Sequence, residues 1–152
     1  MGATLAQRVL DRLPQIALTN AIAFGVLGVE VTLPPLNVRI SDGLRLRPWV
    51  ASRLVPSRKE SFLQAFRIDR AVWVSTPCDF SGELALGIKH LLQAKGRSAV
   101  ITSFNGDYIG YVIPCRYYHL DGYEPRIMSF FGPNVPDYLD ELIRMMALEM
   151  AN

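Results

Sequence analysis

The runs that decide the fold class of this chain are Ala71-Val-Trp-Val-Ser-Thr76, Pro77-Cys-Asp-Phe-Ser-Gly82 and Ser98-Ala-Val-Ile-Thr-Ser-Phe104. The first and third are apolar runs with the length of buried β-strands. Between them, residues 80–94 have helical spacing, with one apolar face formed by Leu84, Ile88, Leu91 and Leu92. A strand–helix–strand succession of this kind predicts two parallel strands joined by a right-handed crossover.

Both ends of this helix carry capping signals. Asp79 or Ser81 is expected to cap its first turn, because a side-chain oxygen there accepts a hydrogen bond from a free backbone N–H. Gly96 is expected to stop it, since glycine tolerates the left-handed conformation that ends many helices.

The segments before this unit add antiparallel strands. Residues 61–67 and 71–76 are β-like runs separated by a short turn, which predicts a hairpin. Residues 24–33 are rich in Val and Leu and are expected to form a further buried strand.

The segment after the unit is expected to return to the sheet. Asn105-Gly106 is a tight-turn dipeptide, and a strand is expected over residues 108–113, ending at Pro114. Residues 126–131 are expected to form a last short strand.

Helical patterns occupy the two chain ends, over residues 4–12 and after Asn134. The expected fold is therefore α/β (mixed α+β). It has a mixed sheet with at least one right-handed β–α–β crossover and flanking helices at both chain ends.

Length and composition limit the class of protein. The chain has 152 residues, 50% of them hydrophobic and 20% charged, as in one globular domain spanning residues 1–152. Its net charge of +2 gives no electrostatic reason to expect nucleic acid or an anionic membrane as a partner. Residues 39–59 are locally basic, and they form either a phosphate-facing patch or a solvated or partner-covered face. The charged residues of this span are the acid Asp42 and the bases Arg39, Arg45, Arg47, Arg53, Arg58 and Lys59.

The two cysteines, Cys78 and Cys115, each follow a proline beside a predicted strand end. Three arrangements are compatible with this pattern: a disulfide, half of a metal site, or two unlinked thiols. Cys78, Cys115, His119 and Asp79 together are a further candidate zinc set, although their spacing matches no closed structural zinc pattern.

Polar residues collect where the predicted strands end, at Asp79, Asn105, Asp107, Tyr108, Tyr111 and Tyr123. Ligand sites of open sheets with helical crossovers tend to lie beyond the carboxyl ends of the strands, so we expect the functional site there. Structural roles are open for the same residues. Asp79 is a possible helix cap, Tyr111 a strand aromatic and Tyr123 a surface-packed ring, while Asn105 and Asp107 suit a turn.

Three motifs resemble the neutral/alkaline non-lysosomal ceramidase family, whose members are zinc amidohydrolases that cleave the N-acyl bond of ceramide. The motifs are Pro77-Cys-Asp-Phe-Ser-Gly-Glu83, Asn105-Gly-Asp-Tyr-Ile-Gly-Tyr111 and Gly122-Tyr-Glu124. Leu33-Pro-Pro-Leu36 and Phe62-Leu-Gln-Ala-Phe-Arg67 also look like this family, so the resemblance covers roughly residues 30–133.

The resemblance implies a set of site residues. The family binds zinc through two histidines, a glutamate and a tyrosine. Asp79 falls at the position of the glutamate and Tyr111 at that of the tyrosine. Tyr123 matches a second tyrosine that stabilises the tetrahedral intermediate. Two departures are visible: Asp79 is one methylene shorter than glutamate, and Cys78 replaces a glycine.

The resemblance also implies that residues 1–152 are the C-terminal portion of a larger catalytic domain. The family's histidine ligands, serine nucleophile and anion-binding arginine lie upstream. We therefore expect part of a zinc-dependent hydrolase of a lipid-like N-acyl amide such as ceramide, inactive alone. A missing N-terminal portion or a second chain would supply the histidines.

Two further expectations follow. The family implies an extracytoplasmic or membrane-surface location, and an incomplete sheet with an exposed apolar face predicts self-association. The alternative to the enzyme is a non-catalytic α/β interaction domain or a degenerate hydrolase fragment.

Overall fold

A four-stranded sheet is the centre of the computed structural model, which describes residues 2–55 and 59–152. Its strand order is β1-β2-β3-β5, with antiparallel pairing from β1 to β3 and parallel pairing between β3 and β5. The strands are β1 (Phe24–Thr32), β2 (Glu60–Ile68), β3 (Ala71–Ser75) and β5 (Ser98–Thr102). The predicted mixed sheet is confirmed.

The predicted hairpin joins β2 and β3, with Ile68 opposite Ala71. Asp69 takes the left-handed conformation that the turn requires, at φ 50°. Its carboxylate accepts a hydrogen bond of 2.7 Å from the backbone N–H of Ala23, just before β1. One turn residue therefore fixes the start of the neighbouring strand.

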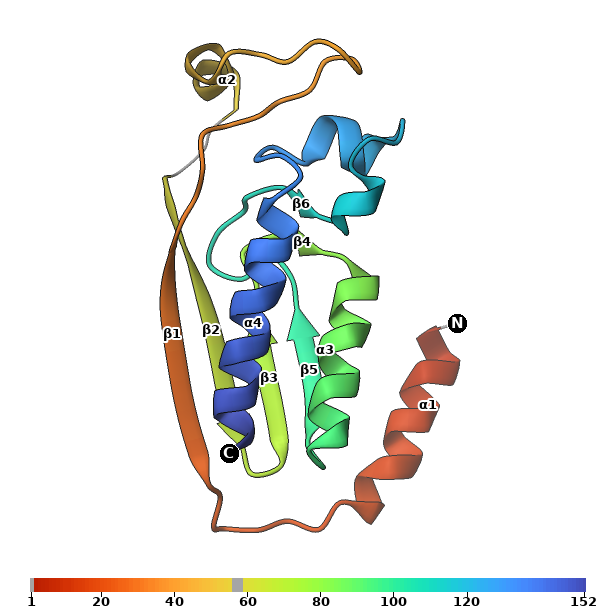
Figure 1. Ribbon diagram of the computed structural model, residues 1–152. Coiled ribbons are helices and arrows are strands. Elements are labelled where there is room, and N and C mark those ends of the chain that lie inside the picture. Colours follow the sequence, from red (N-terminus) through yellow and green to blue (C-terminus); the bar gives the residue numbers. More distant parts are fainter. Residues whose placement is uncertain (1, 56–58) are drawn as a thin grey trace.

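Helix α3 (Gly82–Ala94) connects β3 to β5 and covers one face of the sheet. In Figure 1 it lies in front of the sheet, and β5 points upward to the right of β3, which is the predicted right-handed crossover. Ser81 caps the helix by accepting a hydrogen bond from the N–H of Glu83 at 3.3 Å. Gly96 ends it at φ +71°.

Helix α4 (Val135–Ala151) lies beside α3 on the same face (Figure 1). Arg97 holds its last turn, because the guanidinium donates two hydrogen bonds to the carbonyl of Ala151, at 2.7 and 2.9 Å. The core lies between these helices and the sheet, and its fully buried large side chains include Leu63, Val72, Val74, Ile88, Leu92, Leu139 and Ile143.

A second, two-stranded sheet lies beyond the carboxyl ends of β3 and β5 (Figure 1). It pairs β4 (Asp79–Phe80) with β6 (Tyr111–Val112) in parallel. The predicted strand over residues 108–113 is thus reduced to two residues. Gly110 is the reason, because its φ of +88° interrupts the extended backbone that residues 108–110 would need.

The predicted strand over residues 126–131 is wrong. Residues Tyr123–Met128 form a short π-helix, η3, which follows the 3₁₀-turn η2 (Cys115–Tyr117). Pro125 favours this outcome, since its fixed φ suits the first turn of a helix and it has no N–H for a strand ladder.

Two peripheral helices complete the fold. The predicted N-terminal helix is confirmed as α1 (Gly2–Arg12), followed by the 3₁₀-turn η1 (Leu13–Gln15), but neither buries a side chain. Helix α2 (Pro48–Leu54) lies at the opposite end of the molecule (Figure 1). Every helix in the described ranges is too short or too polar to cross a bilayer.

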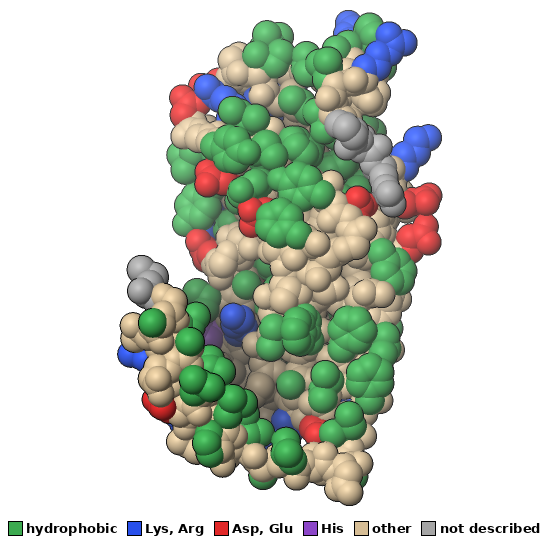
Figure 2. Space-filling view, turned by 180° about the vertical axis from the view of Figure 1, so that it is seen from behind, with side chains coloured by type: hydrophobic (Ala, Val, Ile, Leu, Met, Phe, Trp, Pro, Cys, Tyr) green, Lys and Arg blue, Asp and Glu red, His purple; other side chains and the backbone are tan. Residues whose placement is uncertain are grey.

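The sheet face away from α3 and α4 is exposed, and Figure 2 shows hydrophobic side chains gathered over it. Large apolar side chains on this face that are more than one third exposed are Phe24, Val26, Phe62, Ile68, Trp73 and Val100. The alternation of buried and exposed residues along β2 is the pattern of a strand covered on one face.

Gly110 gives a test of the β4–β6 geometry. A Cβ at this position would lie 2.3 Å from the carbonyl oxygen of Met128, whereas at Gly106, which also has a positive φ, it would meet nothing within 4 Å. We expect Gly106→Ala to lower the free energy of unfolding by about 1–2 kcal/mol, the cost of the conformation alone. Gly110→Ala should cost about 1–3 kcal/mol more because of overpacking. Urea unfolding of both variants measures the difference, and equal losses would contradict the close approach of Met128.

Candidate functional site

The chain turns a buried corner between β3 and β4, and this corner holds the candidate site. The N–H and hydroxyl of Thr76 donate to the carbonyl of Thr102 at 2.9 and 3.0 Å, which ties the corner to the end of β5. The N–H of Phe80 donates to the Ser103 hydroxyl at 3.1 Å. Pro77 and Cys78 are fully buried, so the residue that follows them has a fixed position.

Asp79 and Tyr111 face each other across the small sheet. They are direct partners in the β4–β6 register, and the Asp79 N–H donates to the carbonyl of Gly110 at 3.0 Å. The Tyr111 hydroxyl donates a hydrogen bond to the Asp79 carboxylate. This hydrogen bond, with smaller contributions from desolvation and from the negative charge of Asp79, raises the pKa of Tyr111 to about 12. Asp79 is therefore not the helix cap, a role that Ser81 performs.

Tyr123 packs against Tyr111. The two ring centroids lie 5.9 Å apart with an interplanar angle of 83°, an edge-to-face contact. Ser129 helps to fix this arrangement, because its hydroxyl lies 2.9 Å from the Glu124 carbonyl and 3.4 Å from that of Tyr111. Segments that the sequence separates by up to 44 positions, from Asp79 to Tyr123, thus meet at one place. The roles predicted for these three residues remain predictions.

A pocket of about 420 Å³ opens beside Asp79 and Tyr111. Its acidic lining residues are Asp79, Asp121 and Glu124, and its apolar ones include Phe80, Ile113, Pro114, Leu120 and Pro125. A site with this lining suits a ligand that has both an apolar part and groups that donate hydrogen bonds.

Sequence reasoning missed the residues that shape the rim of this pocket. Glu83, in the first turn of α3, pairs with Arg116 and accepts a hydrogen bond of 3.1 Å from the Tyr117 hydroxyl. Arg126 pairs with Asp121 in a similar way. The Glu83 contacts join surface segments more than 30 residues apart, so no local pattern in the sequence indicates them.

The cysteine alternatives are resolved in favour of two unlinked thiols. Cys78 is buried and Cys115 exposed, and both are free, so the disulfide alternative is excluded. Burial raises the pKa of the Cys78 thiol to about 12, which disfavours the thiolate that a metal needs. No three His, Cys, Asp or Glu side chains in the described ranges are grouped for a metal, so the set with Cys78, Cys115, His119 and Asp79 is also wrong.

The other polar residues near the strand ends serve the backbone or the packing. The Asn105 side chain donates to Ser103 and Thr102, both at 2.9 Å, and the Asp107 carboxylate accepts from the N–H of Tyr108 at 2.8 Å. Tyr108 stacks on Phe104 with a centroid distance of 5.6 Å. Asn105 and Asp107 thus act in the turn, and both line a different pocket from Asp79.

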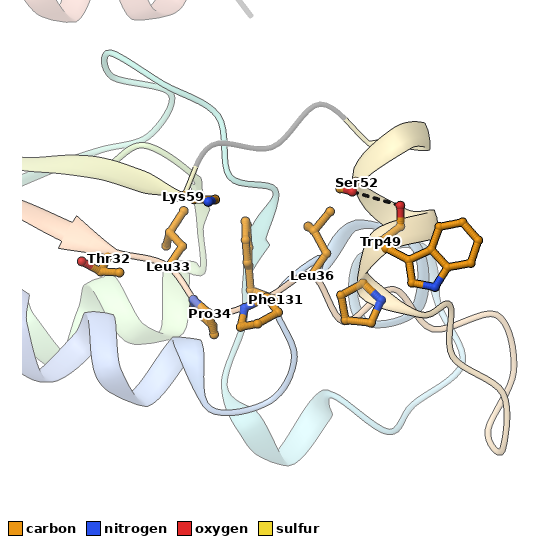
Figure 3. A pocket seen from close by; sticks show the side chains of 10 residues that line it. Thr32, Leu33, Pro34, Leu36, Trp49, Ser52, Lys59 and Phe131 are labelled. Atoms are coloured by element: carbon orange, nitrogen blue, oxygen red, sulfur yellow. Dashed lines mark hydrogen bonds between the residues drawn. The ribbon is translucent and has the colours of Figure 1, made fainter.

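A groove of about 450 Å³ lies elsewhere, at the base of α2 (Figure 3). It is lined mainly by apolar and proline residues, among them Leu33, Leu36, Trp49 and Phe131. Lys59 is the one titratable side chain among the described residues that line it. Among the described residues that line this groove there is no carboxylate, histidine or cysteine.

The donor set at the candidate site fits part of a zinc site. Asp79 supplies carboxylate oxygens and Tyr111 a phenol oxygen, and zinc accepts oxygen ligands of this kind. Catalytic zinc sites usually have three protein ligands, so Asp79 and Tyr111 alone are fewer than such a site needs. No three His, Cys, Asp or Glu side chains are grouped for a metal within residues 2–55 and 59–152.

Comparison with known proteins shows a likeness of fold. No protein-family model and no curated protein sequence matches this chain. Among solved structures, neutral ceramidase from Pseudomonas aeruginosa is similar over 85% of this chain and 28% of its own, with a TM-score of 0.63 and 17% identity. A ceramidase complexed with C2 is similar over 59% of this chain and 14% of its own, with a TM-score of 0.52 and 23% identity. The chain therefore has a ceramidase-like fold and spans less than a third of the length of the ceramidases that it resembles.

Proposed function

We propose that this chain contributes part of the active site of a zinc-dependent amidohydrolase that acts on an N-acyl amide such as ceramide. The observation that carries the proposal is the pairing of Asp79 with Tyr111 across β4 and β6, with Tyr123 packed against Tyr111. The ceramidase-like fold supports the same assignment.

Each of the three side chains has a role in this proposal. Asp79 and Tyr111 would hold the zinc through their oxygens. Bound zinc would supply Lewis acidity for the amide carbonyl and the nucleophile. Tyr123 would donate its hydroxyl hydrogen to the oxygen that becomes negative in the transition state. Tyr123 is 55% exposed, so a substrate could contact its side chain.

The remaining ligands and the nucleophile would come from outside these residues. Two protein ligands are fewer than catalytic zinc sites usually have, so the described residues need at least one more. We propose that a further part of a longer polypeptide, or a second chain, supplies histidines and a nucleophile at the open side of the Asp79 pocket.

A non-catalytic interaction domain is the second candidate. The exposed apolar face of the sheet favours it, because a monomeric soluble protein rarely leaves such a face in water. The two candidates differ at Asp79, since an interaction domain has no need of a metal-binding carboxylate there.

Zinc binding by the 152-residue chain tests the proposed ligands. Asp79→Asn and Tyr111→Phe should each weaken Zn²⁺ binding by about 10-fold or more, because loss of an outer-shell partner alone typically costs 10–100-fold. Competition with a chromophoric chelator gives the affinities. Asp121→Asn is the matched control, an acid of the same pocket that pairs with Arg126. Unchanged affinity in Asp79→Asn would contradict the assignment.

The pH titration of Tyr111 tests its hydrogen bond to Asp79. Its pKa is raised to about 12 because the neutral phenol donates to the carboxylate and the phenolate would be repelled by it. The contribution of this hydrogen bond to the stability of the fold is complete below the ordinary tyrosine pKa of about 10. It is lost as the pH rises through about 12. In Asp79→Asn we expect this pKa to fall toward 10. The Tyr111 pKa is measured from the phenolate absorbance of each protein minus that of its Tyr111→Phe counterpart. The same Tyr111 pKa in the parent chain and in Asp79→Asn would contradict the contact.

Activity of the native protein, with whatever polypeptide completes it, tests Tyr123. A Tyr123→Phe change in the chromosomal gene should lower kcat on a fluorescent N-acyl amide by about 100-fold or more, with KM little changed, because one oxyanion donor is removed. Tyr138→Phe, on the distant helix α4, is the control. A Tyr123→Phe enzyme with full kcat would exclude the oxyanion role.

A further inference from the structure

Residues 38–55 form an arm that ends in α2 and lies at the end of the molecule away from α1 (Figure 1). Its base is fixed. The Leu46 N–H donates to the carbonyl of Val38 at 2.9 Å, which closes a narrow loop. Arg39 is buried, donates to the carbonyl of Leu120 at 2.8 Å and lies over the Tyr118 ring at 5.2 Å. The arm is thus attached to the body, and Arg39 is a structural cation.

The rest of the arm carries unbalanced positive charge. Asp42 is its only acid in the sequence, and it pairs with Arg126 of the body at 2.9 Å. Arg45, Arg47 and Arg53 are exposed, and none of them forms an ion pair with another described residue. Exposed Lys59 adds a fourth cation near the base of the arm. The arm therefore attracts an anionic partner.

Large apolar side chains accompany these cations. Ile40, Leu44, Trp49 and Leu54 are between 50% and 67% exposed. The Arg53 guanidinium lies 5.8 Å from the ring centroid of Trp49, so a cation and an aromatic ring lie side by side on α2. At the upper end of Figure 2, basic and hydrophobic side chains lie side by side.

We propose that this arm docks on the surface of an anionic lipid bilayer. Arginines would contact the headgroups, while Trp49, Leu44 and their apolar neighbours enter the boundary between headgroups and acyl chains. Nucleic acid would satisfy the cations but leave the apolar side chains in water, because its affinity comes largely from phosphate contacts. The arm is a different surface from the Asp79 pocket, so docking by the arm does not depend on catalysis in that pocket.

The groove of Figure 3 fits this partner. It opens at the base of the arm, with apolar walls from Leu36, Trp49 and Phe131. Among the described residues of this groove Lys59 is the charged one, and its sign matches an anionic headgroup. In this groove an acyl chain would contact the apolar walls, and the anionic headgroup beside it would contact Lys59.

Trp49 reports docking directly, because the chain has only two tryptophans, Trp49 and Trp73. In the full chain carrying Trp73→Phe, we expect Trp49 emission to shift to shorter wavelength with vesicles of phosphatidylcholine and phosphatidylglycerol. Phosphatidylcholine vesicles alone, and inorganic phosphate alone, should give no shift. The Trp49→Phe chain, which keeps Trp73 on the sheet, should also give none. Absence of a Trp49 shift with the anionic vesicles would overturn the proposal.

Variants that remove positive charge test whether the arm is the surface that binds the vesicles. Arg45→Gln, Arg47→Gln and Arg53→Gln combined should lower the vesicle partition coefficient on the order of 100-fold, since each basic residue near an anionic surface contributes roughly fivefold. Arg8→Gln with Arg12→Gln on the equally exposed helix α1 is the matched control and should bind as the parent does. Circular dichroism verifies that each variant is folded. A loss in the α1 control with none in the arm variant would overturn the proposal, as would tighter binding to a DNA duplex than to anionic vesicles.

Discussion

The parallel pairing of β4 with β6 holds the candidate site together. Hydrogen bonds from the Asp79 N–H to the Gly110 carbonyl, and from the Ser81 N–H to that of Val112, join a corner after β3 to a segment that follows β5. Each strand has only two residues, so the pairing depends on the buried corner behind it and on the left-handed backbone of Gly110. Because of this constraint, a carboxylate and a phenol from different parts of the chain share one hydrogen bond.

Much of the fold follows from periodicity in the sequence. The hairpin of β2 and β3, the α3 crossover and both terminal helices were predictable, because each has a regular apolar face of sufficient length. The segment after β5 was not. Gly110 and Pro125 decide its conformation through single backbone angles, and the contacts that select them come from residues such as Met128 and Ser129. Local spacing carries no information about such contacts.

The candidate site was also predictable from the sequence only in part. Motif resemblance indicated Asp79, Tyr111 and Tyr123, and the structure brings these three together. The sequence left open whether Asp79 or Ser81 caps α3; the capping hydrogen bond belongs to Ser81, which leaves the Asp79 carboxylate for Tyr111. The rim formed by Glu83, Arg116 and Tyr117 joins segments more than 30 residues apart, so it is visible only in the folded chain.

The central claim is that Asp79 and Tyr111 form part of a zinc site that residues outside this chain's described structure complete. Capture of the native protein from its source, with an antibody against α4, tests it most directly when intact mass and zinc content are measured on the same sample. We expect a polypeptide heavier than 17.0 kDa, or a second chain that co-purifies, with zinc bound. A lone chain of 17.0 kDa without zinc would contradict the claim.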